Sequence, residues 1–168
     1  MRSKTWTIAL TALTAAGWGC ARANDDTDFA RQAASTGMLE VELGSYAAAN
    51  AESPAVKSFG SQMVADHGKA NQELASLAQR LNIALPATMN ADQRAEATKL
   101  MALRGAEFDE AYMKAMVDGH KKAESAFSKQ ADQKKTEIDR WAASTLPTIR
   151  MHLDHAKQLE SQQVSANP

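Results

Sequence analysis

The 168-residue sequence predicts an all-α protein, a bundle of four long helices with one short extra helix. Four stretches carry apolar residues at alternating spacings of three and four, the period of one helix face. Residues typical of turns separate these stretches, and no segment alternates apolar and polar residues as a half-buried strand would. A chain of this length has room for one core of ordinary size, so we expect one domain.

The first helix is expected at about 26–51. This segment is rich in alanine and lacks proline, and Asp25, Asp26 and Thr27 are suitable N-cap residues. Glu40 falls on the same face as apolar and small residues. The pattern therefore predicts a carboxylate in the interior of the bundle.

The second helix is expected at about 54–82. Pro54 is favoured at a first helical position, and Ser53 can cap the helix. His67 lies in the middle of the apolar stripe, which consists of Val56, Phe59, Met63, His67, Ala70, Leu74, Leu77 and Leu81. The sequence "MVADH" around this histidine is echoed by "MVDGH" further along the chain.

A short helix is expected at 90–103, where Asn90 and Gln93 have the spacing of a capping box. The third long helix follows at about 106–130. His120 lies on its inward stripe with Met113, Met116, Ala123 and Phe127, and Tyr112 flanks that stripe.

The last helix is expected to reach about Gln162, with Thr136 and Asp139 forming its N-terminal cap. His152 lies on its inner face. Residues 163–168 are expected to form a flexible tail, so the bundle domain is predicted at 24–162.

The segment between Asn82 and Ala106 is 23 residues long, which exceeds the usual connection of a helical hairpin. The second helix has a length of roughly 40 Å at about 1.5 Å per residue. A connection of this size that contains a short helix can run the length of the bundle. Ferritin-like bundles use one such crossover, so we expect a ferritin-like topology.

Residues 1–23 have the pattern of a secretory signal peptide. Arg2 and Lys4 precede an apolar stretch at 5–18, and Ala21-Arg22-Ala23 is an A-x-A cleavage site. The apolar stretch is shorter than the roughly 20 residues that a transmembrane helix needs. We therefore expect a periplasmic or secreted protein with no transmembrane segment after processing.

Cleavage after Ala23 removes Cys20, the only cysteine, and leaves no thiolate ligand or disulfide. The alternative is a lipoprotein anchored through Cys20. Gly17 and Trp18 fit a lipoprotein processing site poorly.

Removal of residues 1–23 takes away three basic residues and no acid, so the net charge changes from −1 to −4. A nucleic-acid-binding protein would need a concentrated basic face, so this class is not expected. Protein partners and association with further copies of the chain stay open.

Glu40, His67, His120 and His152 each lie near the middle of a different predicted helix, on its inward face. They are therefore expected in one layer whether neighbouring helices are parallel or antiparallel. Three imidazoles and a carboxylate are a plausible ligand set for a single transition-metal ion. A di-iron carboxylate centre is not expected, because the chain contains no Glu-x-x-His motif.

Four further residues are candidates for orienting these ligands. Asp66 and Asp118 are close in sequence to core histidines and can act as hydrogen-bond partners of the rings. His155 lies one turn beyond His152, and Tyr112 lies beside the His120 stripe.

A second interpretation needs no metal. Each histidine is then neutral and bonded to a nearby carboxylate, so that the polar layer fixes the register of the helices. The sequence alone favours this interpretation over the metal site.

Four segments together resemble successive motifs of a bacterial secreted, ferritin-like helical family of unknown function, often labelled predicted outer-membrane or periplasmic proteins. The segments are "STGMLEVELGSYAA", "SFGSQMVADHGKAN", "GAEFDEAYMKAMVDGHKKAESAF" and "STLPTIRMHLDHAKQL", which fall within 28–159. The resemblance implies that eight residues occupy family-pattern positions: Glu40, Glu42, Asp66, His67, Tyr112, His120, Pro147 and His152.

One departure from the family pattern is informative. The second "MVxDH" motif would have an aspartate directly before the histidine, whereas this chain has Gly119 there and Asp118 one place earlier. One residue rotates a side chain by about 100° on a helix. We therefore do not expect two symmetric Asp–His pairs.

The function expected from the sequence is that of an exported, non-enzymatic domain of the cell envelope, related to stress, with a polar His/Glu core. A metal-storage or oxidoreductase bundle that uses the core histidines is the alternative.

Overall fold

The computed structural model describes the backbone of residues 17–166 and the side chains of residues 25–162. Residues 1–16, which hold most of the expected leader, and residues 167–168 of the expected tail lie outside the described residues. Within 17–166 the chain is all-helical, as predicted, and has five helices and no strand. These are α1 (Gly17–Asn50), α2 (Pro54–Leu81), α3 (Ala91–Ala102), α4 (Gly105–Ala131) and α5 (Glu137–Ala166).

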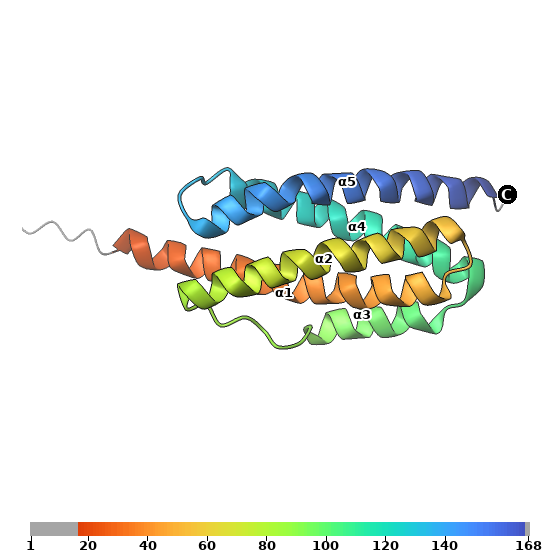
Figure 1. Cartoon of the computed structure of the whole chain (residues 1–168), viewed down its shortest axis with the longest axis horizontal. Coiled ribbons are helices and arrows are strands. Elements are labelled where there is room, and N and C mark those ends of the chain that lie inside the picture. The colour runs from red at the N-terminus through yellow and green to blue at the C-terminus, as the bar shows by residue number, and fades with distance from the viewer. Residues whose placement is uncertain (1–16, 167–168) are drawn as a thin grey trace, which may run out of the picture.

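The four long helices form a bundle, and α3 packs on the outside of it against α1 and α4 (Figure 1). α1 and α2 form one antiparallel hairpin, and α4 and α5 form another. The connection at 82–104, which includes α3, runs back along the bundle, so α2 and α4 point in the same direction (Figure 1). The long linker therefore spans the bundle, as its length predicts.

α1 begins at Gly17, so the predicted start near Asp26 is wrong. No proline occurs between Cys20 and Asp28 to interrupt the helix. The Asp26 side chain does not mark the start of the helix. Asp26 accepts a hydrogen bond of 2.7 Å from the Gln130 side chain. Because Gln130 also donates to Asp139 at 2.7 Å, these bonds link α1 to α4 and α5.

Two of the predicted caps are present. Asn90 and Gln93 form a capping box at the start of α3. At the start of α5, the Thr136 hydroxyl accepts from the Asp139 backbone N–H at 3.1 Å, and the Asp139 carboxylate accepts from the Thr136 N–H at 2.9 Å. Local sequence therefore determines both helix starts.

The start of α2 is stabilised by a residue far away in the sequence. Ser53 is its N-cap residue, but its side chain makes no capping hydrogen bond. Instead, the buried Asp109 carboxylate of α4 accepts from the backbone N–H groups of Glu52 at 3.0 Å and Ser53 at 2.7 Å. The turn between α1 and α2 is thereby fixed to α4.

α1 and α2 approach each other closely at two glycines. A Cβ added at Gly44 would lie 2.8 Å from the carbonyl oxygen of Gly60, and one added at Gly60 would lie 2.7 Å from that of Gly44. Only residues without a side chain permit this backbone contact.

The core consists of two apolar clusters. The first lies toward the α1–α2 turn and includes Leu43, Phe59, Met63, Phe108, Met116 and Leu159. The second lies toward the α4–α5 turn and includes Leu74, Leu77, Phe127, Ile138, Trp141 and Ile149. On α2, α4 and α5 a histidine lies between the residues of the two clusters, so a polar layer divides the core.

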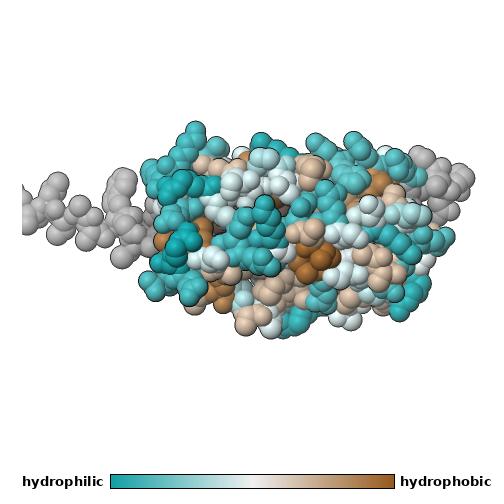
Figure 2. Space-filling view, viewed as in Figure 1, coloured by the Kyte–Doolittle hydropathy of each residue, from teal (hydrophilic) through white to brown (hydrophobic). Residues whose placement is uncertain are grey.

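The surface is largely hydrophilic on the face shown in Figure 2, where apolar residues form small separate groups. Among the described residues, the exposed large hydrophobic side chains are Leu81 and Met151. None of the described helices combines the length and the apolar character needed to cross a bilayer.

Candidate functional site

Three histidines from three helices meet in the polar layer: His67 of α2, His120 of α4 and His152 of α5. A ring nitrogen of each lies within 4.8 Å of a ring nitrogen of each of the others. The three pairs of ring centroids are 5.3, 5.4 and 5.6 Å apart, so the rings form a nearly equilateral triangle. The structure thus brings together three of the four residues that the sequence places in one layer.

Hydrogen bonds set the tautomers of two of these rings. Nδ1 of His120 lies 2.9 Å from the carbonyl oxygen of Met116, and Nε2 of His152 lies 2.8 Å from a carboxylate oxygen of Asp66. Because both partners accept hydrogen bonds, these two nitrogens carry the protons. The other nitrogen of each ring therefore presents a lone pair.

Each of the three rings has one nitrogen that is buried and unpaired. Nε2 of His67, Nε2 of His120 and Nδ1 of His152 make no hydrogen bond to any other described residue. A buried polar group without a partner costs about 1–3 kcal/mol, so three in one layer are unusual in a core.

The three imidazoles are neutral near pH 7. Burial, together with the neighbouring His120 and His152, lowers the pKa of His67 to about 3. Burial lowers the pKa of His120 to about 4, and burial also lowers the pKa of His152, although the Asp66 carboxylate opposes this change. Neutral imidazole is the form that binds metal ions.

Glu40 lies beside this triangle on α1 rather than within it. The set of ligand atoms within 4.8 Å contains the three histidines and no oxygen of Glu40. Its side chain is buried, and its Oε2 atom makes no hydrogen bond to the described residues. Burial and the negative charge of Glu96 raise its pKa to about 8. Glu40 is therefore mainly a neutral acid near pH 7.

The glycine before His120 leaves space for Glu40. A Cβ added at Gly119 would lie 3.6 Å from Oε1 of Glu40, which is an ordinary contact. An aspartate at this position would bring a second carboxyl group toward Glu40.

The four residues expected to orient the ligands have different surroundings in the structure. Asp66 of α2 bonds to His152 of α5 and so orients that ring, rather than the ring of its sequence neighbour His67. Asp118 is bonded to Lys114 at 3.2 Å at the surface, and no hydrogen bond joins it to a described histidine. His155 bonds to Gln62 at 3.3 Å, outside the triangle.

The charged group that acts on Tyr112 is Glu40, not one of the three histidines. Burial, and then the charge of Glu40, raises the pKa of this tyrosine well above its usual value. Its hydroxyl is buried without a hydrogen-bond partner among the described residues, and its ring stacks on Phe108 with centroids 5.5 Å apart.

A cavity of about 630 Å³ leads to the histidines between α1 and α4. His67, His120 and Glu40 line it, together with exposed residues that include Gln32, Glu96 and Lys122. Small residues make much of its wall: Ala33, Gly37, Ala111, Ala115, Gly119 and Ala123. The polar layer is thus connected to the surface.

This cavity was not expected from the sequence. Ala111, Ala115, Gly119 and Ala123 recur at intervals of four, which places them on one face of α4. That pattern is the signal from which a gap beside α4 could have been inferred.

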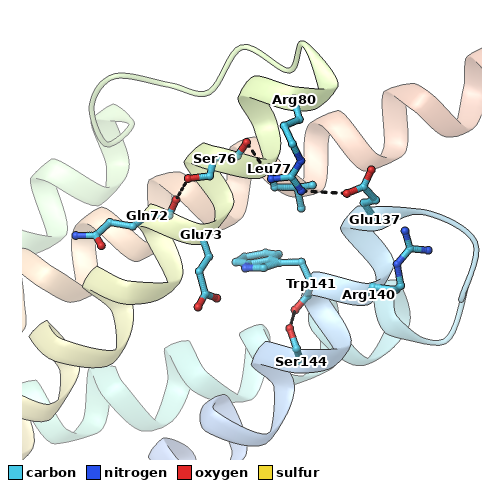
Figure 3. A pocket seen from close by; sticks show the side chains of 9 residues that line it. All are labelled: Gln72, Glu73, Ser76, Leu77, Arg80, Glu137, Arg140, Trp141 and Ser144. Atoms are coloured by element: carbon cyan, nitrogen blue, oxygen red, sulfur yellow. Dashed lines mark hydrogen bonds and ion pairs between the residues drawn. The ribbon is translucent and has the colours of Figure 1, made fainter.

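A second depression lies between α2 and α5, as Figure 3 shows, and has a volume of about 550 Å³. Arg80 and Glu137 form an ion pair of 3.0 Å at one side of it, and the Trp141 indole lies between the two helices. None of the three histidines lines this depression. It is therefore separate from the polar layer.

The comparisons with known proteins give a family. The family model described as Domain of unknown function (DUF4142) matches residues 13–159, which include all three histidines, Glu40 and Asp66. The search of curated proteins found no match, and neither did the search of solved structures. Because the family model covers most of the sequence, the chain belongs to this family, whose function is unknown.

Proposed function

We propose that this protein binds one divalent transition-metal ion through His67, His120 and His152. The proposal rests on three histidines from three helices that each place a ring nitrogen within 4.8 Å of the others and that each have a buried nitrogen without a hydrogen-bond partner among the described residues. An ion with bonds of about 2.1 Å in tetrahedral geometry separates its ligands by roughly 3.4 Å. Small side-chain rotations bring the three rings to that separation.

The arrangement fits a metal better than a hydrogen-bonded histidine core. In the latter, each ring would find a partner for both nitrogens, but the three inward nitrogens have none among the described residues. The outward bonds of His120 and His152 also match the partners that orient ligating histidines.

The donor set indicates the kind of ion. Nitrogen ligands without a thiolate suit zinc, copper, nickel or iron. Three imidazoles with one open position are typical of zinc sites that exchange a ligand. Zinc is therefore the first ion to test.

Export through residues 1–23 and a ferritin-like topology belong to the same proposal. The charged, apolar and A-x-A regions support export. The parallel direction of α2 and α4 and the crossover connection support the topology. Mass analysis of the protein recovered from the periplasm is expected to show a chain that begins at Asn24. A chain retained in the cytoplasm at full length would contradict export.

Metal content tests the binding proposal. The untagged protein is expected to contain about one equivalent of metal per chain, and zinc should raise the Tm of the metal-free protein, because a ligand of the folded state stabilises it. His67→Ala, His120→Ala and His152→Ala should each abolish both effects.

His155→Ala is the matched control, since His155 lies one turn from His152 but bonds to Gln62 outside the triangle. It should retain the metal. A wild-type protein without metal, whose Tm none of zinc, copper, nickel or iron(II) raises, would overturn the proposal.

A further inference from the structure

The cavity between α1 and α4 has the features of a ligand pocket. Its volume of about 630 Å³ lies in the range of small-molecule sites, about 300–1,000 Å³. Hydrogen bonds join α3 to α1 between Gln93 and Ser35 and between the Met101 carbonyl and Tyr46, so α3 covers the part of the gap that lies beside the C-terminal half of α1. The cavity extends from the first turn of α3 toward Phe29 and Phe127, where α3 no longer covers the gap.

Three residues that line this cavity have buried polar atoms without partners. Oε2 of Glu40, Nε2 of His67 and Nε2 of His120 are buried and make no hydrogen bond to the described residues, and all three residues line the cavity. The remaining wall is largely apolar, with Leu39 and Leu43 beside the small residues of α4. An apolar pocket with a few convergent polar groups is the usual form of a site for a small organic ligand.

We propose that this cavity admits a small molecule with an apolar body and a single nitrogen or oxygen head group that carries a lone pair. The head group binds the open position of the metal ion, and the body lies against the alanine-rich wall. The inference rests on the proposed metal site, because three protein ligands leave one position of a tetrahedral ion for an exogenous ligand. Two of the three ligands line the cavity, which directs this position toward it.

Cobalt(II)-loaded protein tests the inference, with imidazole and 4-phenylimidazole as probes. The visible absorption of bound cobalt first shows whether the metal site forms. Both probes should then change this absorption, and 4-phenylimidazole should bind at least about tenfold more tightly because its phenyl ring is buried.

Ala115→Leu and Ala123→Leu fill the cavity wall and should reduce that preference to about onefold, with cobalt still bound. Ala75→Leu, at an exposed position of α2 outside the cavity, is the matched control and should preserve it. Two lining positions are tested so that the result still stands if one of the two variants fails to fold.

The failures are distinguishable. Absence of a cobalt spectrum would overturn the metal site and the inference with it. A cobalt spectrum that neither probe changes would leave the metal site standing and overturn the open position. Equal affinities for the two probes in the wild-type protein would overturn the apolar pocket.

Discussion

Asp66 of α2 accepts a hydrogen bond of 2.8 Å from Nε2 of His152 on α5. The bond joins the two hairpins of the bundle across the polar layer. It also fixes the tautomer of His152, so that the buried, unpaired Nδ1 carries a lone pair. The Asp66 side chain is about one-third exposed, whereas the His152 side chain is fully buried.

Asp66→Ala is therefore expected to weaken metal binding by about 10–100-fold, as loss of a ligand's hydrogen-bond partner does in metal sites. Competition with a chromophoric zinc chelator measures the affinity. Asp118→Ala removes a carboxylate that pairs with surface lysines and serves as the control. Equal affinities of the Asp66 variant and wild type would show that the bond does not orient the ligand.

Glu40 makes the stability of the metal-free protein depend on pH. Its pKa is raised from 4.5 in the unfolded chain to about 8 in the folded protein. Between these values the folded protein keeps a proton that the unfolded chain has released, so stability falls as pH rises and levels off above pH 8. The three histidines act in the opposite direction, and their effect becomes small above about pH 7, because the unfolded chain has then also released most of these protons.

The pH interval from 7 to 9 is therefore dominated by Glu40. The wild-type protein, stripped of metal, is expected to lose about 1 kcal/mol of unfolding free energy across this interval. Urea denaturation at the two pH values measures it. Glu40→Gln should remove this loss, and Glu42→Gln, at an exposed position of the same helix, should keep it. A loss of stability that persists in Glu40→Gln would refute the assignment.

Two glycine-to-alanine substitutions are expected to have opposite effects. Gly60→Ala should destabilise the protein by roughly 1–3 kcal/mol, because the new Cβ would lie 2.7 Å from a carbonyl oxygen of α1. Gly119→Ala should stabilise it by up to about 1 kcal/mol, since its Cβ meets only an ordinary contact and alanine favours the helix. Thermal unfolding of both metal-free variants decides this; the same sign of change in both would contradict the packing described.

Asp109→Ala is expected to destabilise the protein by about 1–3 kcal/mol, because the N–H groups of Glu52 and Ser53 lose a charged acceptor. Asp109→Asn should recover part of this loss, since its amide oxygen still accepts one bond. Chemical denaturation measures both variants. An Asp109→Ala variant as stable as the wild type would show that water replaces the carboxylate.

The helices follow from the sequence because the signals that define them are local. The three-and-four spacing predicts α2, α4 and α5 to within a few residues, and the Asn90–Gln93 box predicts the start of α3. The start of α1 was misplaced, since suitable capping residues do not end a helix that alanine can continue upstream. The end of α5 was misplaced as well, because this helix continues past Gln162 to Ala166, into the expected tail. The common layer of His67, His120 and His152 also follows from position along each helix.

Tertiary structure decided the chemistry of that layer. Imidazoles in one layer can be hydrogen-bonded through both nitrogens, or each can keep one nitrogen with a free lone pair. Which of the two occurs depends on the rotation of each helix and on partners from other helices. Asp66 reaches His152, 86 positions later in the chain, and Glu96 of α3 acts on Glu40. The sequence by itself thus determined an all-helical bundle with a buried polar layer, whereas only the packing of the helices turned three inward nitrogens toward one another and left a cavity beside them.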